Sequence, residues 1–131
     1  MDLPPLILIV DDEPDFREIF SAKLSSVGYR VELAEDGAQA IERAKELKPD
    51  LILMDVRMPN MTGVEALLKL KDDPVTRKTK VLFLSNLGDP QPEVQELNRR
   101  FAEQTGAIGY LKKTDDLEVL VNRVSAVLKS R

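Results

Sequence analysis

Residues 51–59 read LILMDVRMP, an apolar run that ends abruptly on one carboxylate, that of Asp55. A short apolar run bounded by turn residues is typical of a strand that is buried on both faces of a sheet. Pro59, Asn60 and Gly63 then indicate a loop before the next helical pattern begins. In an open parallel sheet, ligands bind in the crevice outside the carboxyl ends of the strands. We therefore expect Asp55 to lie in such a crevice.

The remainder of the chain alternates between strand-like and helix-like patterns. Short apolar segments at residues 6–10, 29–34, 50–54, 80–84 and 107–111 predict five strands. Each is followed by apolar residues at three- and four-residue spacing, which predicts a helix with one buried face. The predicted inward residues are Phe16, Ile19, Phe20, Leu24 and Val27, before a stop at Gly28; Ala38, Ile41, Ala44 and Leu47; Val64, Leu67 and Leu68; Val94, Leu97 and Phe101; and Leu117, Leu120, Val121, Val124 and Leu128. Strict alternation implies parallel strands with right-handed crossovers, so we predict an α/β fold of five strand-helix units.

Composition limits the size and the chemistry of the protein. With 131 residues, 43% hydrophobic and 32% charged, the chain suits a single domain over residues 1–131, with a core from about 5 to 129. The net charge of -4 argues against a nucleic-acid surface. The absence of Cys and His excludes disulfides, thiolate nucleophiles, imidazole triads and the usual zinc sites. The apolar segment 6–10 is too short for a signal peptide or a membrane span, so we expect a cytoplasmic protein.

Polar residues gather where the predicted strands end. Asp11, Asp12, Asp55, Ser85 and Lys113 all fall at or just beyond the carboxyl ends of predicted strands, which a parallel sheet brings to one edge. Three carboxylates in one crevice call for a cation, and oxygen ligands without imidazole favour Mg²⁺. A metal-braced Asp with a hydroxyl and an ammonium nearby has the parts to receive a phosphoryl group as an aspartyl-phosphate.

Each of these residues also has an ordinary structural explanation. The acidic turn at residues 11–13 is typical of a helix N-terminus, where carboxylates complement the helix dipole. Ser85 alone is a loop hydroxyl, Lys112 and Lys113 alone are a solvated pair, and Tyr110 alone is a packing residue. All of these explanations would have to hold together on one edge of one sheet, which favours the functional interpretation.

Four motifs in this order resemble the response-regulator receiver family of two-component signalling. They are Val10-Asp11-Asp12-Glu13, Met54-Asp55-Val56-Arg57-Met58-Pro59 with Gly63, Leu84-Ser85, and Gly109-Tyr110-Leu111 with Lys113. The resemblance covers essentially the whole chain. It implies a flavodoxin-like, doubly wound (βα)5 fold with a parallel sheet of order 2-1-3-4-5. It also implies Mg²⁺-dependent phosphorylation of Asp55 by a histidine kinase or a phosphotransfer protein.

The resemblance further implies a role for each site residue. Asp12, Asp55 and the backbone carbonyl of Arg57 would bind the metal directly, and Asp11 would act through water. Lys113 would contact the phosphoryl group, Ser85 would bond to it and move toward it, and Tyr110 would be the switch aromatic that follows Ser85.

Several positions depart from the family pattern. Thr114 stands where the family usually has a proline after a cis bond; a non-proline cis bond costs roughly 3 kcal/mol, so we expect either a trans bond with a rearranged loop or a strained exception. Asn86 replaces a small residue beside the site and is expected to narrow access to it. Thr62 replaces an Asp with little expected consequence. In this family the positions of Arg57 and Leu87 tune attack by water, and the bulk of these side chains predicts slow self-dephosphorylation.

The leading functional prediction is a stand-alone receiver with no output domain, which is not an enzyme on free substrates. Phosphorylation would change binding to a downstream protein through the fourth and fifth strands and the fourth helix, in a monomer or a phosphorylation-dependent dimer. We expect residues 86–92 and the following helix to set partner specificity. One alternative is a phosphorylation-independent pseudo-receiver that acts as a protein-binding module. Another is a metal-dependent phosphohydrolase, which is disfavoured because the sequence lacks an Asp-x-Asp pair of nucleophile and acid. No Walker loop or dinucleotide turn is present, and an acidic first loop disfavours flavin.

Overall fold

The computed structural model describes residues 3–85 and 107–129. Within them, five parallel strands form one sheet of order β2-β1-β3-β4-β5, flanked by helices. The strands are β1 (Leu6–Val10), β2 (Arg30–Ala34), β3 (Leu51–Asp55), β4 (Lys80–Ser85) and β5 (Ala107–Lys112), and the helices are α1 (Pro14–Ser26), α2 (Gly37–Leu47), α3 (Gly63–Asp72) and α5 (Leu117–Lys129). The predicted flavodoxin-like α/β fold is confirmed. The helix predicted around Val94, Leu97 and Phe101 lies outside the described residues.

The three central strands are buried on both faces, which explains their unbroken apolar sequences. All five residues of β1 and of β3 are buried. Because successive side chains of a strand point to opposite faces, Leu8 of β1 and Met54 of β3 join one core, while Ile9 and Leu53 join the other. A single apolar run therefore supplies two cores.

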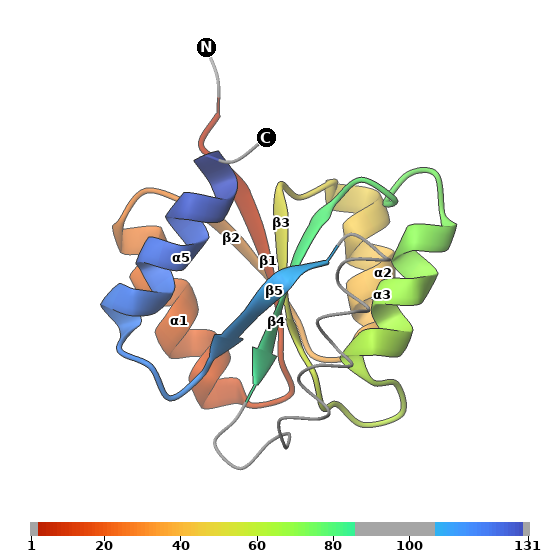
Figure 1. Ribbon diagram of the computed structural model, residues 1–131, viewed down its shortest axis with the longest axis horizontal. Coiled ribbons are helices and arrows are strands. Elements are labelled where there is room, and N and C mark those ends of the chain that lie inside the picture. Colours follow the sequence, from red (N-terminus) through yellow and green to blue (C-terminus); the bar gives the residue numbers. More distant parts are fainter. Residues whose placement is uncertain (1–2, 86–106, 130–131) are drawn as a thin grey trace.

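Helices cover the two faces in pairs. Figure 1 shows α1 and α5 on one side of the sheet and α2 and α3 on the other. The core on the α1 and α5 side is built around Phe20, Leu24, Leu120 and Val124, and the opposite core around Ala40, Ala44, Ala66, Leu67 and Leu70. Because all five strands are parallel, their carboxyl ends lie together at one edge of this sandwich.

Local hydrogen bonds fix where the helices begin and end. Asp36 caps α2 by accepting from Gln39 N at 2.8 Å. Thr62 and Glu65 form a reciprocal capping box at the start of α3. Thr62 thus caps the helix that follows the Asp55 loop, a role that the Asp of the family pattern can also fill, in agreement with the small consequence expected for this exchange. Gly28 follows the end of α1 with φ +104, a left-handed conformation that favours glycine.

Some predicted helix faces and strand ends need correction. Ile19, Val27 and Leu68 are 55%, 47% and 43% exposed, and Ala38 is also exposed. Each lies three or four residues from a residue that packs against a core, namely Phe16, Leu24, Val64 and Ile41 respectively for Ile19, Val27, Leu68 and Ala38. A helix lying on a sheet buries a narrower stripe than that spacing admits. The strands β3, β4 and β5 each run one residue further than predicted, so that Asp55 and Ser85 are the last residues of their strands.

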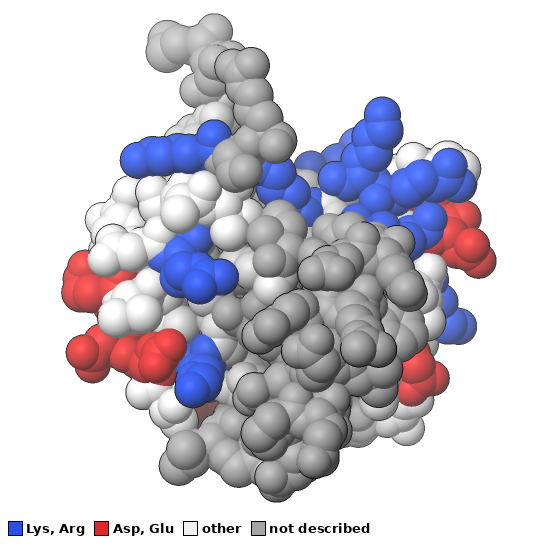
Figure 2. Space-filling view, viewed as in Figure 1, with Lys and Arg blue, Asp and Glu red and all other residues white. Residues whose placement is uncertain are grey.

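Charge is unevenly distributed over the fold. Figure 2 shows Lys and Arg side chains gathered over the end of α3, at the edge of the sheet opposite the carboxyl ends of the strands. Residues 69–80 carry five basic and two acidic residues, whereas the whole chain has a net charge of -4. No helix in the described part of the chain is long and apolar enough to cross a membrane.

Candidate functional site

The loop between β1 and α1 carries the carboxylates of Asp11, Asp12 and Glu13 and is held in place through its backbone. Asp11 is fully buried; its N–H donates to Ala34 O at 3.1 Å and its Oδ1 accepts from Glu13 N at 2.8 Å. Arg17 Nη1 donates to Asp11 O at 2.6 Å. The peptide groups around Asp11 are thus held by β2 on one side and by α1 on the other.

Asp55 ends β3 with only 1% of its surface exposed. Its Oδ1 accepts from Arg57 N at 3.2 Å, and the loop beyond it is held by Gly63 N donating to Val56 O at 3.0 Å. A Cβ atom on Gly63 would lie 2.3 Å from Asp55 O, a separation that real Cβ atoms do not show. Glycine is therefore required at position 63 by the close approach of two backbone segments, and this contact fixes the chain around Asp55.

Lys113 connects the acidic residues. It follows β5, and its N–H donates to Ser85 O at 2.8 Å, which positions it beside the end of β4. Its Nζ lies 2.5 Å from Asp11 Oδ2, 2.9 Å from Glu13 Oε1 and 3.2 Å from Asp55 Oδ2. The same ammonium lies 5.0 Å from the centre of the Phe16 ring, and the side chain is 4% exposed. One nearly buried cation thus contacts three carboxylates.

The acidic residues can hold a metal ion. One carboxylate oxygen from each of Asp11, Asp12 and Asp55 lies within 4.8 Å of the other two. Asp11 Oδ2 is buried and, among the described residues, pairs with Lys113 without regular hydrogen-bond geometry. With Glu13, the cluster holds four carboxyl groups, three of which contact the single ammonium of Lys113. An oxygen-only donor set with excess negative charge fits a hard divalent cation such as Mg²⁺.

Burial and crowding shift the ionisation of these groups. Burial, and then the charge of Asp11, raise the pKa of Asp55 to about 7, although Lys113 acts in the opposite direction. Burial also raises the pKa of Asp11, against the lowering effect of Lys113. Burial alone would lower the pKa of Lys113, but its contacts with Asp11 and Glu13 outweigh burial and leave that pKa above its usual value. The cluster favours additional positive charge.

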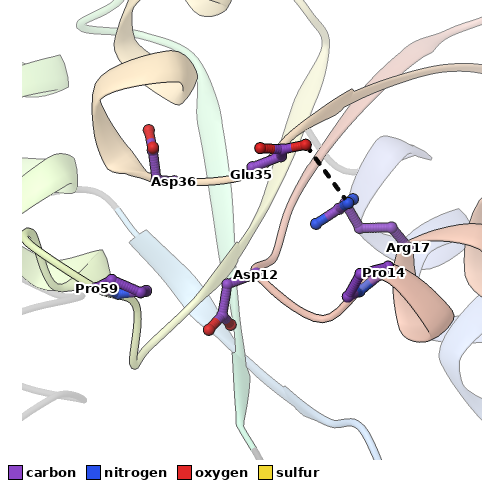
Figure 3. Close-up of a pocket in the computed structure, with 6 residues that line it drawn as sticks. All are labelled: Asp12, Pro14, Arg17, Glu35, Asp36 and Pro59. Atoms are coloured by element: carbon purple, nitrogen blue, oxygen red, sulfur yellow. Dashed lines mark ion pairs between the residues drawn. The ribbon is translucent and has the colours of Figure 1, made fainter.

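A cavity of about 300 Å³ opens beside Asp12. It is lined by Asp12, Pro14, Arg17, Glu35, Asp36 and Pro59, which come from the loops after β1, β2 and β3 and from the start of α1. Figure 3 shows Asp12 between Pro14 and Pro59, with the ion pair of Arg17 and Glu35 above it. Solvent and a partner molecule can therefore approach the acidic cluster from this side.

The fold brings most of the predicted site residues together. The carboxylates of Asp11, Asp12 and Asp55 meet, and Lys113 contacts two of them. Ser85 is 7% exposed at the end of β4.

The structure describes some of the remaining predicted positions and not others. Thr114 is exposed and follows a trans bond, because no cis peptide occurs among the described residues. Tyr110 belongs to β5, but its side chain lies outside the described part, as do Asn86 and Leu87.

Three contacts of the site were not predicted from the sequence. Glu13 pairs with Lys113, Phe16 lies against the same ammonium, and Arg17 holds the carbonyl of Asp11. The run of three acids at residues 11–13 was a usable indication for Glu13. Nothing in the helical spacing of Phe16 and Arg17 distinguishes them from an ordinary core residue and an ordinary surface cation.

Comparison with known proteins agrees with the geometry. The family model of the response regulator receiver domain matches residues 7–125. The DNA-binding dual master transcriptional regulator RpaA of Synechocystis is 36% identical over 125 residues, which cover 95% of this chain and 49% of the regulator. Protein PilH of Pseudomonas aeruginosa is 34% identical over 122 residues, which cover 93% of this chain and 96% of PilH. The chain thus spans about half of the first relative and nearly all of the second.

A solved structure gives the same fold with a metal. The receiver domain of a Pseudomonas aeruginosa sensor histidine kinase, with a magnesium ion coordinated in its active-site cleft, is 29% identical to this chain with a TM-score of 0.79. The match covers 97% of this chain and 99% of that domain. The match to the family model agrees with the five-stranded parallel sheet and the acidic cluster of this chain. The chain therefore belongs to the response regulator receiver domain family of two-component signalling.

Proposed function

We propose that this protein accepts a phosphoryl group on Asp55 from a histidine kinase or a phosphotransfer protein. The observation that carries the proposal is the contact of Lys113 Nζ with both Asp11 and Asp55 at the edge of the sheet. A carboxylate can act as a nucleophile toward phosphorus, and an ammonium beside it can neutralise the charge on the phosphoryl oxygens. Glu13 also contacts Lys113, but its side chain is 53% exposed, whereas Asp55 is buried at the end of β3 beside the loop held by Gly63.

The metal in this proposal is Mg²⁺. Asp12, Asp55 and the backbone carbonyl of Arg57 would hold it, and Asp11 would act through water. When bound, the ion would offset the repulsion among the carboxylates and neutralise charge on the incoming phosphoryl group. Support comes from the three converging carboxylates and from the magnesium ion in the related kinase receiver domain.

The transfer itself needs no acid or base from the chain. An ionised oxygen of Asp55 attacks phosphorus, the bond between phosphorus and the imidazole nitrogen of the donor breaks, and the imidazole leaves with the electron pair. Lys113 holds the phosphoryl oxygens during this step, and Ser85 bonds to one of them afterwards. Arg57 and Leu87 hinder the later attack of water on the phosphorylated Asp55, so self-dephosphorylation is slow. Apart from this chemistry on its own Asp55, the chain is not an enzyme.

The signalling role extends to partners. The chain acts as one receiver domain in the cytoplasm, and it matches 96% of the length of PilH. Phosphorylation shifts a two-state equilibrium of β4, β5 and the intervening segment, with Tyr110 as the switch aromatic. A downstream protein binds the altered surface, and the protein is a monomer or a dimer that forms on phosphorylation.

The test is incubation of the purified protein with acetyl phosphate and Mg²⁺, followed by intact-mass spectrometry. One phosphoryl group is expected on the wild type, and none after Asp55→Asn or after removal of Mg²⁺ with EDTA. Asp115→Asn is the matched control, because Asp115 is exposed in the loop after β5, and it should be phosphorylated like the wild type. A wild type that gains no mass would overturn the proposal in favour of a phosphorylation-independent binding module. An equal gain in Asp55→Asn would overturn the assignment of Asp55 as the phosphoacceptor.

A further inference from the structure

Arg17 occupies an unusual position for a helix-surface arginine. It lies in α1, and its side chain is only 13% exposed. Its Nη1 donates to Asp11 O at 2.6 Å, and its Nη2 lies 3.8 Å from Glu35 Oε1 beyond the end of β2. In Figure 3 the guanidinium lies across the cavity from Asp12 and is joined to Glu35. Arg17 thus links α1, the acidic loop and the loop after β2.

The carbonyl that Arg17 holds belongs to the peptide between two of the acidic residues. Because a peptide group is planar, fixing Asp11 O also fixes the nitrogen of Asp12 and the direction in which that residue leaves the loop. The N–H of Asp11 is held independently by Ala34 O at 3.1 Å. With the peptide groups on both sides of Asp11 held, the loop presents the carboxylates of Asp11 and Asp12 in one arrangement.

The acidic cluster attracts a cation in the metal-free protein, but this attraction does not explain a guanidinium beside a site that would hold a metal ion. A guanidinium near the acidic cluster repels any metal ion that binds there, because its positive charge partly offsets the negative charge of the carboxylates. Its buried position also costs side-chain freedom. A compensating benefit is therefore expected, and the contact with the loop backbone supplies one.

We propose that Arg17 is a positioning residue for the divalent cation, which acts by holding the Asp11–Asp12 peptide so that the Asp12 carboxylate points into the metal site. This inference rests on the metal site of the proposed function, but not on phosphoryl transfer. Groups that orient metal ligands without touching the metal typically change metal affinity by about 10- to 100-fold when they are removed. Positioning and charge thus predict opposite signs for the loss of Arg17.

The experiment is calorimetric titration of the full chain with Mg²⁺, together with thermal unfolding of the metal-free protein. Arg17→Met keeps the apolar stem and removes the guanidinium, and Arg17→Gln is a shorter neutral variant that cannot reach Asp11 O. Arg43→Met is the matched control, because Arg43 is also a helix arginine that pairs with a carboxylate of β2, that of Glu32, and it does not line the cavity. Titrations at about 0.1 M and about 1 M KCl separate screened charge effects from geometry.

Arg17→Met is expected to raise the Kd for Mg²⁺ by about tenfold or more at both salt concentrations, while Arg43→Met leaves it unchanged. If Arg17→Met does not fold, Arg17→Gln decides by the same measurement. A rise of less than about threefold, or tighter binding, overturns the inference, because geometry would then matter less than charge. A wild type that binds Mg²⁺ but is not phosphorylated by acetyl phosphate would overturn the proposed function alone.

Discussion

Replacing Asp55 with Asn should stabilise the metal-free protein, by an amount that grows with pH. The folded-state pKa of Asp55 is about 7, against an ordinary value of 3.8. The folded protein therefore keeps a proton on Asp55 over a range in which the unfolded chain has lost it, and its stability falls as pH rises through that range. Asn carries no titrating group, so Asp55→Asn escapes this loss.

The size of the effect follows from the two pKa values. The pKa of Asp55 in the folded protein lies about 3 above its ordinary value. At 1.36 kcal/mol per pKa unit, this difference lowers the free energy of unfolding by about 4 kcal/mol at high pH. Between pH 5 and pH 7 the unfolded carboxyl is ionised and the folded one is protonated. The advantage of Asp55→Asn should therefore grow by about 2 to 3 kcal/mol over those two units.

Urea unfolding of both proteins in EDTA, at several pH values from 5 to 8, measures this difference. Asp115→Asn is the control, because it removes an exposed carboxyl beyond β5, and it should track the wild type. An advantage of Asp55→Asn that stays flat from pH 5 to 8, or that turns into a loss at pH 8, would refute the account of a carboxyl destabilised by burial and by Asp11.

Two further predictions concern packing. Gly63→Ala should destabilise the fold by about 1 to 3 kcal/mol and slow phosphorylation, since its Cβ would meet Asp55 O at 2.3 Å. Gly37→Ala should cost less, because the three atoms nearest to its added Cβ all belong to the side chain of Met61 and not to backbone. An equal loss in urea unfolding would argue against the backbone contact at Gly63. Phe20→Ala should cost about 3 to 5 kcal/mol and the exposed Ile19→Ala less than about 0.5, and the reverse order by the same method would mean that α1 buries another face.

The sequence predicts the sheet well because each strand is indicated by a short, continuous segment of the chain. The apolar runs that end at Val10, Met54 and Leu84 are short, continuous and bounded by polar residues, which is typical of a strand buried on both faces. Once the strands are parallel, their carboxyl ends share one edge. The meeting of Asp11 with Asp55 then follows from topology without any knowledge of side-chain geometry.

The contacts that the sequence does not reveal depend on the rotation of helices against the sheet. The spacing in α1 fits Ile19 as well as Phe20, and only packing shows that the first is exposed and the second buried. The same rotation turns Phe16 toward Lys113 and Arg17 toward Asp11 O. The capping role of Thr62 is different, because Thr followed three residues later by Glu is a recognisable pattern, and the sequence could have shown it.

The stability of this protein and its capacity to bind a cation arise from the same unbalanced charge. Ionised Asp55 lowers the stability of the metal-free fold because burial and Asp11 oppose its charge. Mg²⁺ binds the folded state and stabilises it by mass action, and it relieves the repulsion that Asp55→Asn also relieves. Two changes that remove one repulsion cannot each recover its full energy, so their effects should not add. At pH 8, Mg²⁺ should therefore raise the unfolding free energy of the wild type more than that of Asp55→Asn. Equal increments would mean that the cation is held by carboxylates other than Asp55.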